Sequence, residues 1–222
     1  MPSDIIPLEN RDKPAIRGRH LLIFLGVCPA VLALAVYLMR HHAAQLGLLQ
    51  ALALFFAACL ASVVVAAASL GRAALPALGF RRAGWRPIVY GTLGTLVVSV
   101  VMTQIGPEPD GVKEALKVSR DPGQFLTSLA VMAAFAPLVE ELMFRGLLYG
   151  WLENRWNSGL AWIVSSLVFA AAHYEPAHIV LVLPLGLLFG WLRRRTDSLL
   201  PSLCAHMANN AFAVVAAAYL DF

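Results

Sequence analysis

The chain has 222 residues, of which 59% are hydrophobic and only 14% are charged, and its formal net charge is +4. A soluble domain of this length exposes more charge, so the composition argues against a soluble protein and for a membrane protein. The three cysteines, Cys28, Cys59 and Cys204, all lie in apolar stretches and form no C-x-x-C pair. Such cysteines are typical of small buried side chains.

The apolar residues fall into about seven runs that are long enough to cross a hydrocarbon core of roughly 30 Å. The runs lie near residues 21–39, 47–70, 88–106, 124–151, 158–174, 177–192 and 198–220, and the sixth is the shortest. In lipid only helices or closed barrels satisfy the backbone, and the alternation of barrel strands is not visible. The sequence therefore predicts an all-α polytopic membrane bundle of about seven transmembrane helices.

The lysines and arginines between these runs are unevenly distributed. Twelve lie before the first run or in the loops after the second, fourth and sixth, and four lie in the loops on the other side. This positive-inside pattern predicts a cytoplasmic N-terminus and an outer C-terminus. It also explains the basic excess, so we expect no nucleic-acid partner. The first 20 residues are polar without the features of a signal peptide, which makes the first run a retained span.

Three parts are expected: a cytoplasmic tail at 1–20, three N-terminal helices within 21–106, and a membrane core at 124–220. The polar insert between them is read as an outer connecting loop, with a surface helix or lid as the alternative. Two similar stretches, GLLYGWL at 146–152 and GLLFGWL at 186–192, each combine G-x-x-x-G with a tryptophan. The glycines predict close helix packing, and Trp151 and Trp191 are expected at the cytoplasmic boundary.

The stretch APLVEELMFRG, residues 136–146, places three ionisable residues inside an apolar run. Glu141 and Arg145 are four residues apart on one helical face, which predicts an ion pair. Glu140 points about 100° away and has no partner on its own helix. Pro137 weakens the helix ladder just before it.

Three further polar residues lie within apolar runs at a depth similar to that of Glu140. His173 lies near the end of the fifth run, and His206 and Asn210 share one face of the seventh, with Asn209 on the adjacent edge. Ionisable groups at one depth in neighbouring helices indicate a buried polar site. His178 follows a proline at a helix start, where solvation at the membrane interface explains it.

These residues form three motifs that resemble the signature of the CAAX-processing and bacteriocin-immunity (CPBP, or Abi) family of intramembrane proteases. The motifs are Glu140-Glu141-x-x-x-Arg145, Phe169-x-x-x-His173 and His206-x-x-x-Asn210. Each motif alone is weak, but all three occur in order on three predicted helices. The resemblance covers roughly residues 124–220.

The resemblance implies hydrolysis of a peptide bond inside the membrane by a glutamic protease. On this basis Glu140 is the general base that activates water with the help of His173, while His206 and Asn210 form the oxyanion hole. Glu141, Arg145, Phe169 and Asn209 would support them. The implied substrate is a membrane-associated polypeptide or one with a C-terminal signal, and the implied location is the plasma or inner membrane.

Several alternatives stay open at this stage. Glu140, His173 and His206 would also make a His₂Glu zinc set, although H-E-x-x-H is absent and a metal-free mechanism is favoured. A non-proteolytic immunity or scaffold protein, and a proton-coupled transporter, are the competing functions. The sequence does not indicate an oligomeric state or a particular substrate.

Overall fold

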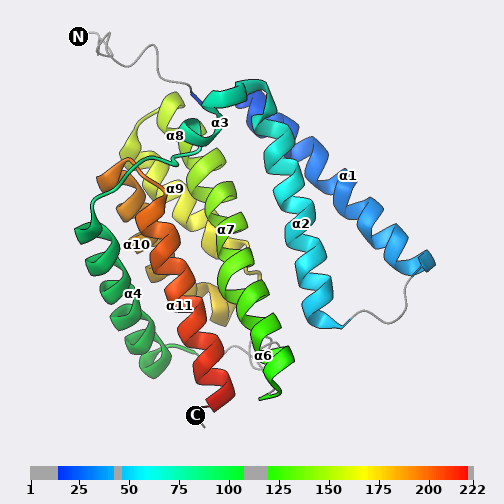
Figure 1. Cartoon of the computed structure of the whole chain (residues 1–222). Coiled ribbons are helices and arrows are strands. Elements are labelled where there is room, and N and C mark those ends of the chain that lie inside the picture. Colours follow the sequence, from blue (N-terminus) through cyan, green and yellow to red (C-terminus); the bar gives the residue numbers. More distant parts are fainter. Residues whose placement is uncertain (1–14, 43–46, 108–119, 220–222) are drawn as a thin grey trace.

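The computed structural model describes residues 15–42, 47–107 and 120–219, and in these ranges it contains helices and no strand. This confirms the all-α prediction, with helical structure in each of the seven predicted windows (Figure 1). The elements are α1 (Gly18–His42), α2 (Leu48–Ala67), η2 (Ala68–Ala73), α3 (Ala74–Ala77), α4 (Trp85–Ile105), α6 (Pro122–Ser128), η3 (Leu129–Phe135), α7 (Ala136–Glu141), η4 (Leu142–Leu148), α8 (Tyr149–Arg155), α9 (Ser158–Ala171), α10 (Pro176–Thr196) and α11 (Leu200–Tyr219).

Five helical stretches of the described chain are long and apolar enough to cross a membrane. They are Gly18–Tyr37, Leu48–Ala77, Trp85–Ile105, Pro122–Arg155 and Pro176–Thr196. The shortest helix of the seven windows is α9 with 14 residues, whereas α10 has 21. The expectation that the sixth window is the shortest was therefore wrong, because α10 continues through the three arginines at 193–195 to Thr196. Helix α11 is not among the five and carries His206, Asn209 and Asn210.

The outer surface of the bundle is apolar, as a surface in contact with lipid requires. On α4 an exposed stripe runs through Tyr90, Leu93, Val97, Val101 and Ile105, and Val97 and Ile105 are 64% and 74% exposed. The three- and four-residue spacing puts these side chains on one helical face. A contiguous apolar stripe of this length marks a membrane-facing surface, and the protein is a multi-pass membrane protein.

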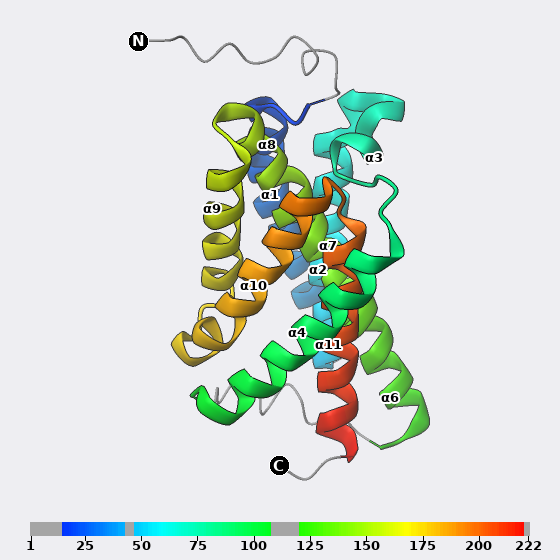
Figure 2. The same cartoon turned by 90° about the vertical axis from the view of Figure 1, so that its left-hand side faces the viewer.

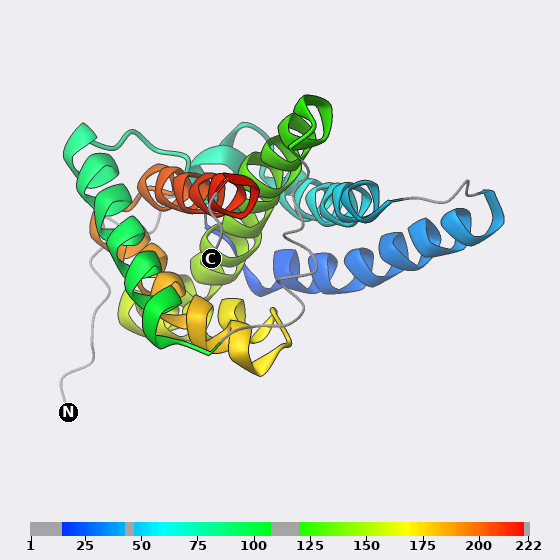
Figure 3. The same ribbon diagram turned by 90° about the horizontal axis from the view of Figure 1, so that it is seen from below.

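The helices alternate in direction across the bundle. Figures 1 and 2 show the start of α1, the η2–α3 turn and the α8–α9 turn at one end, and the start of α6 and the end of α11 at the other. The end that holds α3 and α8 also holds the α10–α11 turn, where the Ser198 hydroxyl donates to the carbonyl of Arg81 at 2.7 Å. Seen from below, α1 and α2 extend to one side of the remaining helices (Figure 3).

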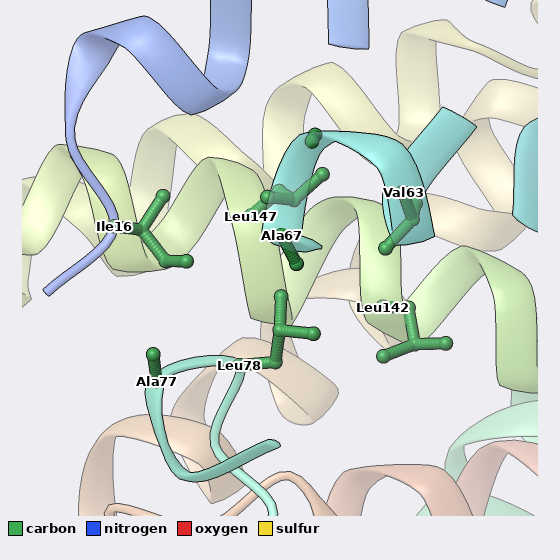
Figure 4. Packing of buried hydrophobic residues seen from close by; sticks show 8 residues of the cluster. Ile16, Val63, Ala67, Ala77, Leu78, Leu142 and Leu147 are labelled. Carbon is green, nitrogen blue, oxygen red and sulfur yellow. The ribbon is translucent and has the colours of Figure 1, made fainter. Parts of the chain in front are cut away.

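A buried apolar cluster joins α1, α2, α3 and η4 near the end where α1 begins. Ile16, Val63, Leu78 and Leu147 are at most 4% exposed, and Figure 4 shows them between the ribbons of these elements. The first G-x-x-x-G serves this packing, because a Cβ atom added at Gly146 would lie 3.1 Å from Leu78.

The second G-x-x-x-G brings α10 close to α9. A Cβ atom at Gly186 would lie 2.9 Å from Cδ1 of Phe169, and one at Gly190 would lie 2.7 Å from the hydroxyl of Ser166. The Ser166 hydroxyl donates to the carbonyl of Gly186 at 2.9 Å. Close packing at both glycine pairs is therefore confirmed, and at α10 it fixes the position of Phe169.

Candidate active site

The helix from Pro122 to Arg155 is continuous over 34 residues but changes its winding twice. Segments η3 and η4 are π-helical, and the short α7 between them carries Pro137, Glu140 and Glu141. Proline has no N–H for the helix ladder, and π-helical turns are frequent at functional sites. The irregular winding therefore falls beside the two glutamates.

Glu141 and Arg145 form the ion pair that their spacing predicts. Oε1 of Glu141 lies 3.1 Å from Nη1 of Arg145, and both side chains are fully buried. Arg145 also donates from Nη2 to the carbonyl of Gly186 at 2.9 Å, and its guanidinium carbon lies 4.1 Å from the centre of the Phe169 ring. The charge of Glu141 is thus compensated inside the protein, as burial requires.

His206 lies between the two glutamates. Its Nδ1 is 3.1 Å from Oε1 of Glu141, and its Nε2 is 3.5 Å from Oε2 of Glu140. Because an ionised carboxylate only accepts hydrogen bonds, Nδ1 is the donor toward Glu141. The ring stacks on Phe189 with the centroids 4.6 Å apart and the planes at 20°. The contact with Glu141 was not predicted, since Glu141 had been paired with Arg145 alone.

His173 lies in the turn that follows α9. Its Nδ1 is 3.0 Å from the carbonyl oxygen of Phe169, which can only accept, so Nδ1 carries a proton. In the neutral ring Nε2 then holds the free lone pair. The Phe169 ring lies 5.1 Å from the His173 ring, so this phenylalanine contacts both the arginine and the histidine of the motifs.

Asn210 is oriented by the π-helical segment. Its Nδ2 donates to the carbonyl of Met132 in η3 at 3.0 Å, and its Oδ1 accepts from Nδ2 of Asn209 at 3.3 Å. An amide nitrogen has two hydrogens, and the bond to Met132 uses one of them. Asn209 therefore contacts the side chain of Asn210, and its supporting role stays a prediction.

A cavity of about 390 Å³ brings these groups together. Glu140, His173, His206 and Asn210 all line it, together with Phe169 and Asn209, whereas Glu141 and Arg145 do not. The remaining lining is mostly apolar and includes Phe56, Met102 and Leu185. Apolar walls with a few convergent polar groups are typical of a ligand site. The four residues expected to act together thus face one space, from α7, the α9–α10 turn and α11.

His178 also lines this cavity, which differs from the expectation that it is solvated at the membrane interface. Its ring centroid lies 4.6 Å from that of His173, with the planes at 77°. The reason is the tight turn before Pro176, where α10 begins, because it folds the first turn of α10 back onto His173. The two histidines are on different elements, so no helical spacing could reveal their contact.

A metal ion needs several donor side chains that converge on one position. Within the described ranges, no three His, Cys, Asp or Glu side chains are arranged to hold a metal ion. His206 directs one ring nitrogen at each glutamate, with Nδ1 3.1 Å from Glu141 and Nε2 3.5 Å from Glu140. The zinc set of Glu140, His173 and His206 therefore stays the alternative to a metal-free mechanism.

Comparison with known proteins agrees with the three motifs. Residues 122–212 match the family model described as Type II CAAX prenyl endopeptidase Rce1-like. The chain is 30% identical over 87 residues to "Putative membrane peptidase YdiL" of Bacillus subtilis (strain 168), and 31% identical over 129 residues to "Membrane-embedded CAAX protease MroQ" of Staphylococcus aureus (strain USA300). For this region the resemblance to the CAAX-processing and bacteriocin-immunity family is confirmed.

The two relatives match only part of this chain and only part of their own length. The match to YdiL covers 39% of this chain and 36% of that protein, and the match to MroQ covers 54% and 51%. The chain therefore spans about half the length, or less, of the relatives that it matches. No solved structure gives a significant match.

Proposed function

We propose that this protein is an intramembrane endopeptidase that hydrolyses a peptide bond of a membrane-associated polypeptide. The observation that carries the proposal is the shared cavity: Glu140, His173, His206 and Asn210 all line one space with apolar walls. A carboxylate, imidazoles and an amide are the groups that activate water and stabilise an oxyanion. The names of the two relatives, a membrane peptidase and a CAAX protease, support the same reaction class.

In the proposed reaction Glu140 is the general base. Its carboxylate removes a proton from a water molecule while the water oxygen bonds to the carbonyl carbon of the peptide. The lone pair on Nε2 of His173 orients this water by accepting its second hydrogen. When the tetrahedral intermediate collapses, Glu140 returns the proton to the leaving amine nitrogen. The products are a carboxylic acid and an amine, and one water is consumed.

His206 and Asn210 stabilise the negative oxygen of this intermediate. Asn210 supplies the amide hydrogen that is not bonded to Met132. His206 donates from Nε2, and its second proton on Nδ1 is bonded to Glu141. A doubly protonated His206 together with Arg145 would balance the charges of the two glutamates. Preorganised donors of this kind typically contribute about 10²–10³ in rate.

The proposed mechanism needs no resident metal. Support comes from the side-chain geometry, because both ring nitrogens of His206 face glutamates and His173 uses Nδ1 on a backbone carbonyl. Zinc-dependent hydrolysis by Glu140, His173 and His206 is the competing version. It predicts that a chelator abolishes cleavage and that added zinc restores it.

The proposed location is the plasma or inner membrane of a bacterial cell. The organisms of the two relatives are bacteria, and the apolar outer surface of the helices requires a bilayer. Cavity residues such as Phe56, Met102 and Leu185 favour apolar substrate side chains next to the scissile bond.

The first test is cleavage by the purified full chain in detergent. Solubilised membrane proteins of the host serve as the substrate mixture, and mass spectrometry reads the new termini. A quenched fluorescent peptide built around the preferred bond then gives rates for wild type, Glu140→Gln, His173→Ala and His206→Ala. Each variant is compared at equal folded fraction, with and without a chelator.

Loss of cleavage by about 10²–10⁴ in all three variants, without an effect of the chelator, supports the glutamic protease. Chelator sensitivity that is reversed by zinc assigns the same residues to a metal site. If no new termini form, or if the Glu140→Gln protein cleaves as wild type does, the protease proposal fails and a scaffold role replaces it.

A further inference from the structure

Helix α10 carries a buried arginine that the proposed mechanism does not use. The side chain of Arg193 is 2% exposed, whereas Arg194 and Arg195 beside it are exposed. A buried guanidinium is unfavourable unless acceptors use its N–H groups. The acceptors around Arg193 therefore indicate why this side chain is buried.

The guanidinium of Arg193 contacts four other parts of the chain. Its Nε donates to the carbonyl of Arg145 in η4 at 3.3 Å, and its Nη1 lies 3.1 Å from Oδ1 of Asp197, which follows α10. Its carbon lies 4.8 Å from the centre of the Tyr149 ring. It also packs against Gly79, where φ is +94° and an added Cβ would lie 2.9 Å from Nε. A positive φ together with so close an approach favours glycine at this position.

Helix α10 binds Arg145 at two points. The carbonyl of Gly186 accepts from Nη2 of Arg145 at 2.9 Å, and Arg193 donates to the backbone carbonyl of the same arginine. Because seven residues make about two helical turns, Gly186 and Arg193 lie on one face of α10, roughly 10 Å apart along its axis. One face of α10 thus holds both the guanidinium and the backbone of Arg145.

The backbone contact falls where the winding is irregular. Arg145 lies in the middle of the π-helical segment η4 (Leu142–Leu148), where backbone bonds run over five residues instead of four. A donor from outside the helix can bond to a carbonyl in such a turn. The side chain of Arg145 pairs with Glu141, and Glu141 contacts Nδ1 of His206, each at 3.1 Å. A continuous series of contacts therefore connects Arg193 with the proposed oxyanion donor.

We infer that Arg193 is a positioning residue for the proposed protease. It holds the backbone of Arg145 and, through the side chains of Arg145 and Glu141, fixes the place of His206. The inference rests on the proposed function and adds to it a residue outside the three motifs. Arg193 does not line the cavity, so it acts only through these neighbours. Since a misplacement of about 1 Å can cost about 10²-fold in rate, loss of this support should be visible in kcat.

Arg81 offers a matched control for the first test, because it shares Asp197 with Arg193. Its Nε donates to the carbonyl of Pro76 and not to Arg145. Lysine keeps the charge at either position but lacks the rigid fork of donors. In Arg193→Lys we expect kcat to fall at least about tenfold with KM within about twofold of wild type, whereas Arg81→Lys keeps the wild-type kcat. Rates are measured with the fluorescent peptide at equal folded fraction.

A second pair of variants keeps Arg193 but displaces its guanidinium. In Gly79→Ala the new Cβ would lie 2.9 Å from Nε and 3.2 Å from the guanidinium carbon. Gly71→Ala is the control, because φ is also positive there, at +53°, but a Cβ meets nothing within 4 Å. Both replacements place a side chain at positive φ, so a decrease in kcat confined to Gly79→Ala reports the displacement of Arg193. This pair decides the question if Arg193→Lys does not fold.

The placement of His206 is measured separately from activity. The nitrogen NMR shifts of its imidazole, assigned by their loss in His206→Ala, report its bond to Glu141 in the detergent-solubilised protein. We expect these shifts to change in Arg193→Lys and to keep their wild-type values in Arg81→Lys.

The outcomes separate this inference from the proposed function. If the wild type cleaves no substrate, the protease proposal fails, and the imidazole shifts alone decide whether Arg193 places His206. If the wild type cleaves, and Arg193→Lys is less stable but keeps both its kcat per folded molecule and its imidazole shifts, Arg193 has only a structural role and the inference is overturned. Equal losses of kcat in Arg193→Lys and Arg81→Lys, or in Gly79→Ala and Gly71→Ala, also overturn it.

Discussion

Nδ1 of His206 lies 3.1 Å from Oε1 of Glu141, and the same carboxylate oxygen lies 3.1 Å from Nη1 of Arg145. One buried carboxylate therefore connects the arginine of the first motif with the histidine of the third. Glu141 does not line the cavity, so in the proposed mechanism it acts on substrate only through His206. The proposed role of the second glutamate of the motif is thus to position an oxyanion donor.

The first prediction concerns this carboxylate. Glu141→Gln keeps an acceptor oxygen for His206 but removes the charge that favours a second proton on the ring. We expect kcat to fall about 10- to 100-fold with little change in KM, as for other carboxylates that orient a functional histidine. Steady-state rates with the fluorescent peptide check this.

Glu153→Gln is the matched control, because Glu153 lies on the same helix and does not line the cavity. Its kcat should stay near that of wild type. A Glu141→Gln protein with unchanged kcat, or with a change confined to KM, contradicts the role assigned to Glu141.

The second prediction concerns Arg145. Arg145→Met leaves Glu141 charged and fully buried without its cation, which typically costs about 3–5 kcal/mol in the free energy of unfolding. Adding Glu141→Gln removes the uncompensated charge, so the double variant should recover most of the loss. Thermal unfolding in detergent measures the order of stability: wild type, then the double variant, then Arg145→Met. If the double variant is the least stable of the three, the two side chains do not compensate each other.

The helices and several contacts were predictable from the sequence because they depend on local spacing. Long apolar runs predicted where the helices lie along the chain. The four-residue separation of Glu141 and Arg145 predicted their ion pair. The glycines at 186 and 190 predicted close packing through their small size. Each of these inferences needs only residues on one helix.

The remaining contacts depend on how helices are placed relative to one another. Sequence spacing showed that His206 and the glutamates share a depth but not that His206 lies between both carboxylates. The turn that brings His178 against His173 and the π-helical winding that frees the Met132 carbonyl leave no periodic signal. The roles of these residues in catalysis stay predictions.

The third prediction concerns the α9–α10 packing. In Gly186→Ala the new Cβ would lie 2.9 Å from Phe169, whose ring supports Arg145 and His173. Overpacking of this kind typically costs about 1–3 kcal/mol, and it should lower both the melting temperature and kcat. Gly94→Ala on α4 is the control, because a Cβ there meets nothing within 4 Å. Equal melting temperatures and rates for the two variants contradict the prediction.

The fourth prediction separates two roles for His178. If its ring holds His173 by edge-to-face packing, His178→Phe keeps the contact and most of the activity, whereas His178→Ala loses a pair worth about 0.5–1.5 kcal/mol. The loss corresponds to a decrease in kcat of up to about tenfold, since about 1.4 kcal/mol is tenfold in rate. Tyr174→Ala, in the same turn and 88% exposed, should leave kcat unchanged.

Rates and their pH profiles for the three variants provide the measurement. A His178→Phe protein as slow as His178→Ala, with an altered pH profile, shows that the ring nitrogens of His178 take part and contradicts a packing role.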